Sequence, residues 1–110
     1  MSQVLLVYVT AADVEEAERI GEAVVDGRLA ACANIVDGMR TIFRWEGSVQ
    51  KGREAILILK TREDLFEELK DRVIELHSYD LPCVVAVRIE TGHEPFLEWV
   101  EAETGPSLFA

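Results

Sequence analysis

Two stretches of the chain are continuously apolar, and they predict the two central strands of a sheet. Residues 4–9 read VLLVYV, and residues 55–59 read AILIL. Strands that are buried on both faces show such runs, whereas half-exposed strands alternate between apolar and polar residues. A domain of 110 residues covers one face of its sheet with its own helices. We therefore expect another copy of the chain to cover the second face.

The region from Met39 to Thr61 predicts one long β-hairpin folded at Gly47. In residues 41–46 (TIFRWE), Thr41, Phe43 and Trp45 alternate with Ile42, Arg44 and Glu46, and this period of two with aromatic and β-branched residues is typical of a strand. Gly47 supplies the positive φ that a tight hairpin turn requires. A strand from Leu29 to Val36 leads into the hairpin, and Asp37-Gly38 predicts a bulge in it.

Apolar residues at helical spacing predict two helices that pack on the sheet. The first begins after Asp13, which forms a capping-box pattern with Glu16, and it ends near Gly27. The second is expected to begin at Thr61 as its cap, with Asp64 three residues later. Its inward stripe is predicted to contain Leu65, Leu69, Val73 and Leu76.

The last third of the chain predicts an edge strand and a short third helix. From Cys83 to Ile89 the residues alternate, and the more apolar set contains Cys83, which we therefore expect to be a core residue. Pro95 begins the third helix, and Gly105-Pro106 ends it. One side of that helix carries Phe96, Trp99 and Val100.

The element order βαββαβ predicts an α+β fold, a ferredoxin-like sandwich with a long hairpin between its second and third strands and an extra C-terminal helix. The first and third strands are expected to be central and the other two to lie at the edges. Residues 1–110 are interpreted as a single domain.

The charge, apolar content and cysteine spacing of the chain limit the partners and metal sites that we expect. The formal net charge of -10 and the pI near 4.6 repel phosphate backbones, so we expect no nucleic-acid partner. No apolar run reaches the roughly 20 residues of a membrane-spanning helix, and the N-terminus lacks a signal-peptide pattern. A cytoplasmic location is expected, without a membrane partner. Cys32 and Cys83 form neither a CxxC pair nor a zinc spacing.

Several separated motifs resemble one known family, the CutA divalent-cation-tolerance proteins, over nearly the whole chain. The motifs are LAACANI (29–35), FRWEG (43–47), GREAILILKT (52–61), HSYDLP (77–82) and FLEWV (96–100). The resemblance implies a ferredoxin-like subunit in a homotrimer, with sheets facing inward and hairpins pairing across subunits. It also implies an architecture similar to the nitrogen-regulatory PII signalling proteins and an association with copper and other divalent metals.

The chain departs from the family pattern at the expected metal ligands. Val9 and Leu76 occupy positions where some members carry Cys and His, and Cys83 replaces the usual acidic residue after the proline. The remaining metal candidates are His77 and Cys32, with copper or another divalent cation as the ligand. Two structural alternatives stay open, because His77 could instead complement the carbonyls at a helix end and Cys32 could be a small buried residue.

A second candidate site consists of Trp45, Glu54, Lys60 and Tyr79, which the resemblance places near a cleft between subunits. A cationic group, a phenol and an indole around a cavity could hold a small anionic or planar ligand. The structural alternative is an interface network in which Glu54 or a carbonyl group satisfies the Lys60 ammonium.

Three functions are considered. The first is a trimeric cytoplasmic protein of divalent-cation, particularly copper, tolerance that binds the metal directly. The alternative is a PII-like signalling or scaffold trimer that binds a small metabolite in its intersubunit clefts. An enzyme has little support, because the chain contains no nucleophile elbow, phosphate-binding glycine loop or HExxH motif.

Overall fold

The computed structural model of the protein describes residues 3–106. Its elements are β1 (Val4–Ala11), α1 (Val14–Asp26), β2 (Cys32–Trp45), β3 (Ser48–Arg62), a 3₁₀ turn (Glu63–Leu65), α2 (Phe66–Leu76), β4 (Val84–Arg88) and α3 (Glu94–Glu103). All neighbouring strands are antiparallel, in the order β2-β3-β1-β4. The predicted ferredoxin-like βαββαβ order, with β1 and β3 central, is confirmed.

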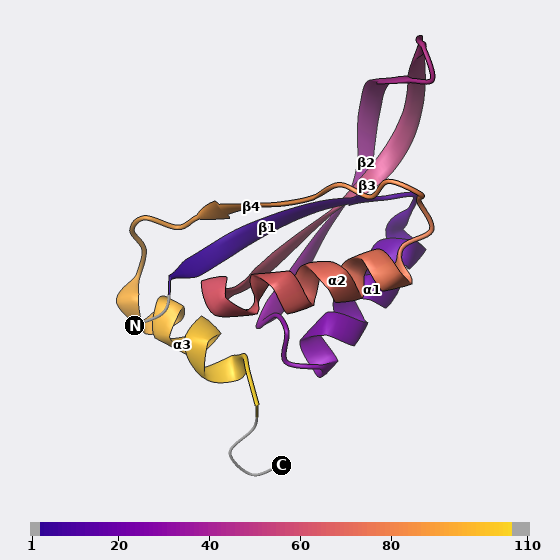
Figure 1. Ribbon diagram of the computed structural model, residues 1–110. Helices are drawn as coiled ribbons and strands as arrows, with labels where there is room; N and C mark the ends of the chain where they lie inside the picture. Colours follow the sequence, from indigo (N-terminus) through magenta and orange to yellow (C-terminus); the bar gives the residue numbers. More distant parts are fainter. Residues whose placement is uncertain (1–2, 107–110) are drawn as a thin grey trace.

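Helices α1 and α2 cover one face of the sheet (Figure 1). Alternate residues of the two central strands point to this face and are fully buried, among them Val7, Val9, Leu57 and Leu59. They pack against apolar residues at helical spacing on the two helices: Ala17, Ile20, Val24, Leu69 and Val73. The core therefore lies between the helices and one side of the sheet.

The other side of the sheet has no helical cover among residues 3–106 (Figure 1). Tyr8 is 37% exposed, Val85 54% and Val87 62%, although all three belong to strands that pair side by side. We call this surface the open face, and its apolar residues are Leu6, Tyr8, Val36, Ile56, Ile58, Val85 and Val87. The bare second face expected from the sequence is confirmed.

The hairpin of β2 and β3 extends well beyond the two layers (Figure 1). Trp45 pairs with Ser48, and the two residues between them have positive φ, 48° at Glu46 and 83° at Gly47. This conformation matches a two-residue turn of the mirror-image type that suits the twist of hairpins. The register shifts between Val36 and Met39, so the predicted bulge is also confirmed. We call residues 39–54 the arm.

The predicted cap of α2 is wrong. Thr61 lies in β3, fully buried, and its Oγ1 donates to the Leu29 carbonyl at 2.7 Å. The helix begins only at Phe66, after the 3₁₀ turn, and no side chain caps it. Leu29 lies before β2, which starts at Cys32 and not at the predicted Leu29. Threonine is common both at helix N-caps and in strands, and here the hydrogen bond to the Leu29 carbonyl holds Thr61 in a strand.

The predicted orientation of β4 is also wrong. Val84 and Ala86 pack against the core, whereas Val85 and Val87 point to the open face. Cys83 lies just before the strand and is only half-buried. The more apolar side of β4, with Val85 and Val87, faces away from the helices because the open face of the sheet is itself an apolar surface.

The C-terminal helix covers one end of the sheet. Val100 is fully buried and packs with Val4 and Ala31. Phe96 and Trp99, predicted on the same side, remain partly exposed, with their ring centroids 5.6 Å apart. Only the Val100 part of the predicted stripe is therefore buried in a single chain.

Candidate functional site

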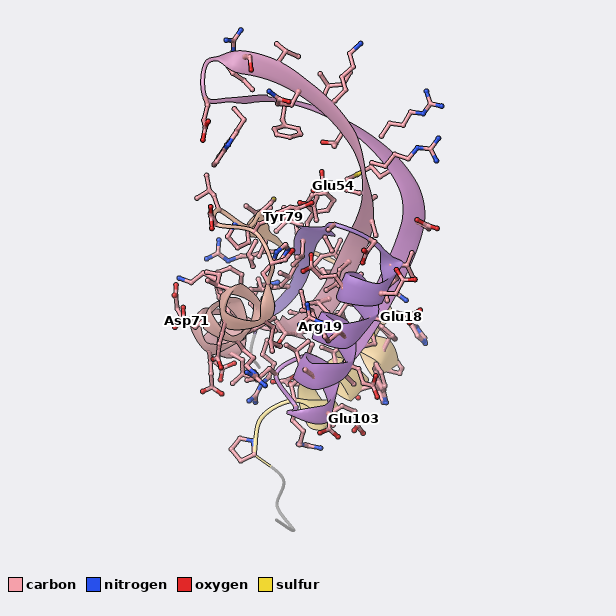
Figure 2. The ribbon with its side chains drawn as sticks, turned by 90° about the vertical axis from the view of Figure 1, so that its right-hand side faces the viewer. Glu18, Arg19, Glu54, Asp71, Tyr79 and Glu103 are labelled. Carbon is pink, nitrogen blue, oxygen red and sulfur yellow. The ribbon has the colours of Figure 1, made fainter. Side chains whose placement is uncertain are left out.

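A hollow of about 640 Å³ lies where the arm curves over the loop between α2 and β4, and we call it the bay. The arm contributes one wall and the loop, residues 77–83, the other (Figure 2). The lining residues are Thr10, Thr41, Phe43, Trp45, Gln50, Lys51, Gly52, Arg53, Glu54, Tyr79, Asp80, Leu81 and Cys83. A volume of this size is typical of small-molecule sites.

Three of the four residues predicted for a cleft, Trp45, Glu54 and Tyr79, do line the bay. The Tyr79 hydroxyl donates to Glu54 Oε2 at 2.8 Å, and Figure 2 shows the two residues near each other at the base of the arm. Burial, followed by the hydrogen bond and charge of Glu54, raises the pKa of Tyr79 far above its ordinary value. Tyr79 is therefore a neutral hydrogen-bond donor that fixes the Glu54 carboxylate.

Lys60, the fourth predicted residue, does not line the bay of its own chain. It lies six residues from Glu54 along β3, which is about 20 Å in a strand. Its Nζ donates to Asn34 Oδ1 at 2.8 Å and lies 5.5 Å from the centroid of the Phe96 ring. Within residues 3–106, the side-chain amide oxygen of Asn34 on the neighbouring strand, and not Glu54, accepts a hydrogen bond from this ammonium.

His77 is buried, and both of its ring nitrogens have partners. The backbone N–H of Tyr79 donates to Nδ1 at 3.1 Å, so Nδ1 is the acceptor and the ring proton lies on Nε2. Nε2 then donates to the Thr10 carbonyl at 2.7 Å. The side chain is fully inaccessible to solvent. His77 thus joins the end of β1 to the loop that carries Tyr79, and neither nitrogen has a lone pair free for a metal ion.

Glu16 is a second buried group in this region. Asp13 caps α1 as predicted, accepting from the Glu16 N–H at 2.8 Å. The Glu16 carboxylate, however, accepts from the backbone N–H groups of Ala12 and Ser78, both at 2.9 Å. Burial acts to raise the pKa of Glu16, but these hydrogen bonds outweigh it and lower the pKa below its ordinary value. Sequence reasoning missed this link, because Ser78 lies 62 residues away.

The residues of one chain do not fit a closed metal site. Cys32 pairs with Lys60 at the far end of the open face, whereas His77 contacts Thr10 at the opposite end of β1. Within residues 3–106, no group of three or more His, Cys, Asp or Glu side chains could hold a metal ion together. The two predicted ligands, His77 and Cys32, are therefore not brought together within one subunit.

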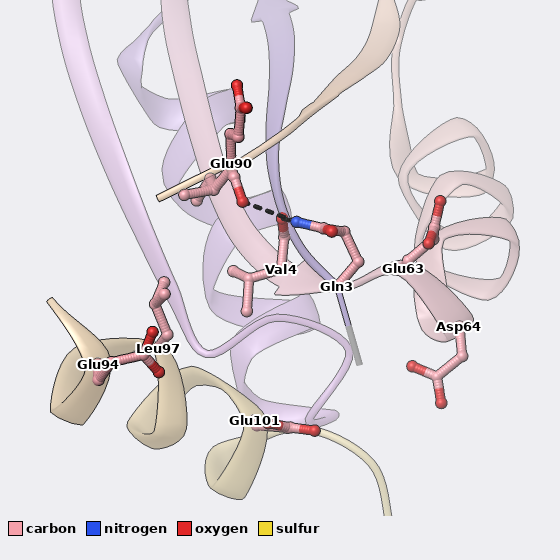
Figure 3. A pocket seen from close by; sticks show the side chains of 9 residues that line it. Gln3, Val4, Glu63, Asp64, Glu90, Glu94, Leu97 and Glu101 are labelled. Atoms are coloured by element: carbon pink, nitrogen blue, oxygen red, sulfur yellow. Dashed lines mark hydrogen bonds between the residues drawn. The ribbon is translucent and has the colours of Figure 1, made fainter. Parts of the chain in front are cut away.

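A second hollow, of about 570 Å³, lies between β1, α3 and the 3₁₀ turn (Figure 3). Its side chains are mainly acidic, and they include Glu63, Asp64, Glu90, Glu94 and Glu101. Gln3 crosses its floor and donates to the Ile89 carbonyl at 2.7 Å. These carboxylates are spread around the rim and do not converge on a point as the ligands of a metal ion do.

Sequence reasoning missed the other lining residues of the bay, among them Phe43, Asp80 and Cys83. Phe43 could have been found, because strand alternation places it on the same side as Trp45. Burial and the charge of Glu54 raise the pKa of the Cys83 thiol. The thiol is therefore a poor nucleophile at neutral pH, where the thiolate is the reactive form.

Comparisons with known proteins identify the family to which this chain is similar. The family model described as CutA1 divalent ion tolerance protein matches residues 5–103. A protein of Pyrococcus horikoshii named divalent-cation tolerance protein CutA is 42% identical over 100 residues, covering 91% of this chain and 97% of the relative. No helix in residues 3–106 is long and apolar enough to cross a membrane.

Solved structures show the same fold. The crystal structure of CutA1 from Oryza sativa has a TM-score of 0.92 at 40% identity, covering 96% of this chain and 97% of that one. A structure from Archaeoglobus fulgidus, titled the periplasmic divalent cation tolerance protein CutA, has a TM-score of 0.85 at 41% identity, covering 88% and 94%. The chain therefore belongs to the CutA1 divalent ion tolerance family.

Proposed function

We propose that the protein acts in divalent-cation tolerance as a cytoplasmic homotrimer that binds copper or another divalent cation. Family membership supports the role in cation tolerance. The single observation that supports the assembly is the open face, an apolar sheet surface that no element within residues 3–106 covers.

The open face supports self-assembly through its apolar composition. Its central rows combine Leu6 with Val87 and Tyr8 with both Ile58 and Val85. Large contiguous apolar patches on a single subunit mark interaction surfaces, since exposing them to water is unfavourable. Copies of the same chain are the expected cover, and the family resemblance favours three copies over two.

Direct binding of a divalent cation is proposed independently of the trimer. His77 could bind copper only after losing one of its two hydrogen bonds, and Cys32 lies at a distance from it. Binding through these residues thus requires either local rearrangement or a ligand from a second subunit. We therefore expect the affinity of this site for copper to be weak.

Calorimetric titration of the metal-free assembled protein with copper tests this step. Direct binding predicts a saturable isotherm that weakens in His77→Ala and in Cys32→Ser. Glu98→Gln, which removes one exposed carboxylate of α3, is the matched control and should leave the isotherm unchanged. If neither His77→Ala nor Cys32→Ser changed the isotherm, His77 and Cys32 would not be copper ligands. Unsaturable binding would contradict direct metal binding altogether.

A second candidate is supported by the bay. A PII-like trimer would bind a small metabolite there, and the bay offers one aromatic wall and a fixed carboxylate. A thermal-shift screen with nucleotides, amines and organic acids tests this function, since a ligand of the native state raises the melting temperature. A bay ligand should lose its effect in Trp45→Ala and keep it in Trp99→Ala.

A further inference from the structure

Phe43 and Trp45 form the aromatic wall of the bay, and the described part of the chain, residues 3–106, leaves both rings partly uncovered. Phe43 is 45% exposed and Trp45 43%, and both lie on the side of the arm that faces the loop. Pairing places them opposite Gln50 and Ser48, which are small or polar and leave the rings uncovered. The faces of such rings carry partial negative charge and attract cations.

The floor of the bay carries a negative charge without a counter-charge. Glu54 accepts one hydrogen bond, from the neutral Tyr79 hydroxyl, through Oε2. Within residues 3–106, no Lys, Arg or His nitrogen lies within 4.0 Å of its carboxylate. Asp80 adds a second carboxylate at the rim. The chain thus holds an anionic group in place and leaves one of its oxygens available.

Two cationic residues, Lys51 and Arg53, also belong to the lining. Strand alternation directs their side chains to the opposite side of the arm from Gly52 and Glu54. Arg53 pairs there with Arg40, so the arm collects its cations on the outer side. The inner side therefore remains aromatic and acidic.

We propose that the bay binds a planar organic monocation, such as an amidinium or an aromatic ammonium, with its charge on Glu54 and its flat body against Phe43 and Trp45. This inference rests on the second candidate function, and it names the class of ligand. The combination of aromatic faces with one ionised carboxylate selects for a charged, flat, partly apolar molecule.

Other ligand classes fit the bay less well. An anion would lie against two carboxylates and be repelled by them. A bare divalent cation prefers several oxygen, nitrogen or sulfur ligands, and the described residues offer no group of three. A neutral aromatic molecule would use the rings and leave the Glu54 charge uncompensated.

Three probes that share one ring test the charge selection: benzamidinium, benzamide and benzoate, which are cationic, neutral and anionic. The full-length assembled protein carries Trp99→Phe, so that Trp45 is the only tryptophan and its fluorescence reports on the bay. Benzamidinium should change this fluorescence saturably and bind at least about tenfold more tightly than benzamide. Benzoate should bind most weakly of the three.

Variants show whether the binding depends on the bay. Glu54→Gln should weaken benzamidinium binding at least about tenfold, since it replaces a charge-assisted contact with a neutral one. Glu98→Gln on α3 is the matched control and should have no effect. Tyr79→Phe should preserve the preference for the cation, because this variant leaves the Glu54 charge in place.

The outcomes distinguish a failure of the proposed ligand class from a failure of the bay as a binding site. Preferential binding of benzoate, or equal binding of all three probes, would overturn the ligand class and leave the bay as a binding site. Benzamidinium binding that survives Glu54→Gln unchanged would overturn the assigned anchor. If none of the probes binds, the ligand class is refuted, and the thermal-shift screen then decides the second candidate function independently.

Discussion

Glu16→Gln is the change whose effect follows most directly from the structure. The Glu16 carboxylate is 6% exposed and receives two backbone N–H groups, from Ala12 and Ser78. Glutamine has one acceptor oxygen, so its NH₂ group must turn toward one of these donors and leave that N–H unpaired. An unpaired buried donor costs about 1–3 kcal/mol, and replacing a charged acceptor by a neutral one adds about 1 kcal/mol. We expect a loss of about 2–4 kcal/mol.

The assay is urea unfolding at one fixed subunit concentration, because assembly makes stability depend on concentration. The pKa of Glu16 in the folded state is lowered from its ordinary value of 4.5. Its contribution to stability is therefore complete above about pH 4.5 and is lost as the pH falls through the folded-state pKa. The difference between the parent protein and Glu16→Gln should be largest near about pH 7 and shrink toward about pH 3.

The control is Glu18→Gln, an exposed position on the same helix (Figure 2). It should change the free energy of unfolding by no more than about 0.5 kcal/mol. If Glu16→Gln were as mild as this control, or if its effect were the same at both pH values, the two backbone hydrogen bonds would not be stabilising the fold as described.

Two further changes test the core and the arm. Leu57→Ala removes a fully buried side chain and should cost about 2–5 kcal/mol by urea unfolding; a value like that of Leu81→Ala, at an exposed position, would refute the assigned core. Gly47→Ala forces alanine into a φ of 83° and should lower stability in thermal unfolding by about 1 kcal/mol. Gly52→Ala, whose added Cβ meets only Thr41 at 3.8 Å, should be milder; equal effects would contradict the turn.

Much of the fold was predictable, because its signals are local. The runs at residues 4–9 and 55–59 identified the central strands, and Gly47 identified the turn. The errors at Thr61 and in β4 arose where the tertiary structure overrode a local pattern. Thr61 has the features of a helix cap, but a hydrogen bond to a residue 32 positions away holds it in a strand. Val85 and Val87 have the features of core residues, but the face they occupy is open in a single chain.

The candidate site was only partly predictable. Glu54 and Tyr79 were expected in one site through a family resemblance, and in the structure a hydrogen bond joins their side chains. The separation of Lys60 from Glu54 was predictable from their spacing of six residues in one strand, but its partner Asn34 was not, since that depends on the register of β2 against β3. The partners of His77 could not be read from the sequence either, because they depend on how the loop after α2 meets the end of β1.

Light scattering of the full chain at micromolar concentration tests the open face most directly. A homotrimer has a mass three times the 12.3 kDa of one subunit, and we expect a lower mass for Val85→Glu, which places a charge on the open face. Ile74→Glu, at a similarly exposed apolar position on α2, should keep the mass of the parent. A parent protein that stays at the mass of a single subunit would contradict the shared interface.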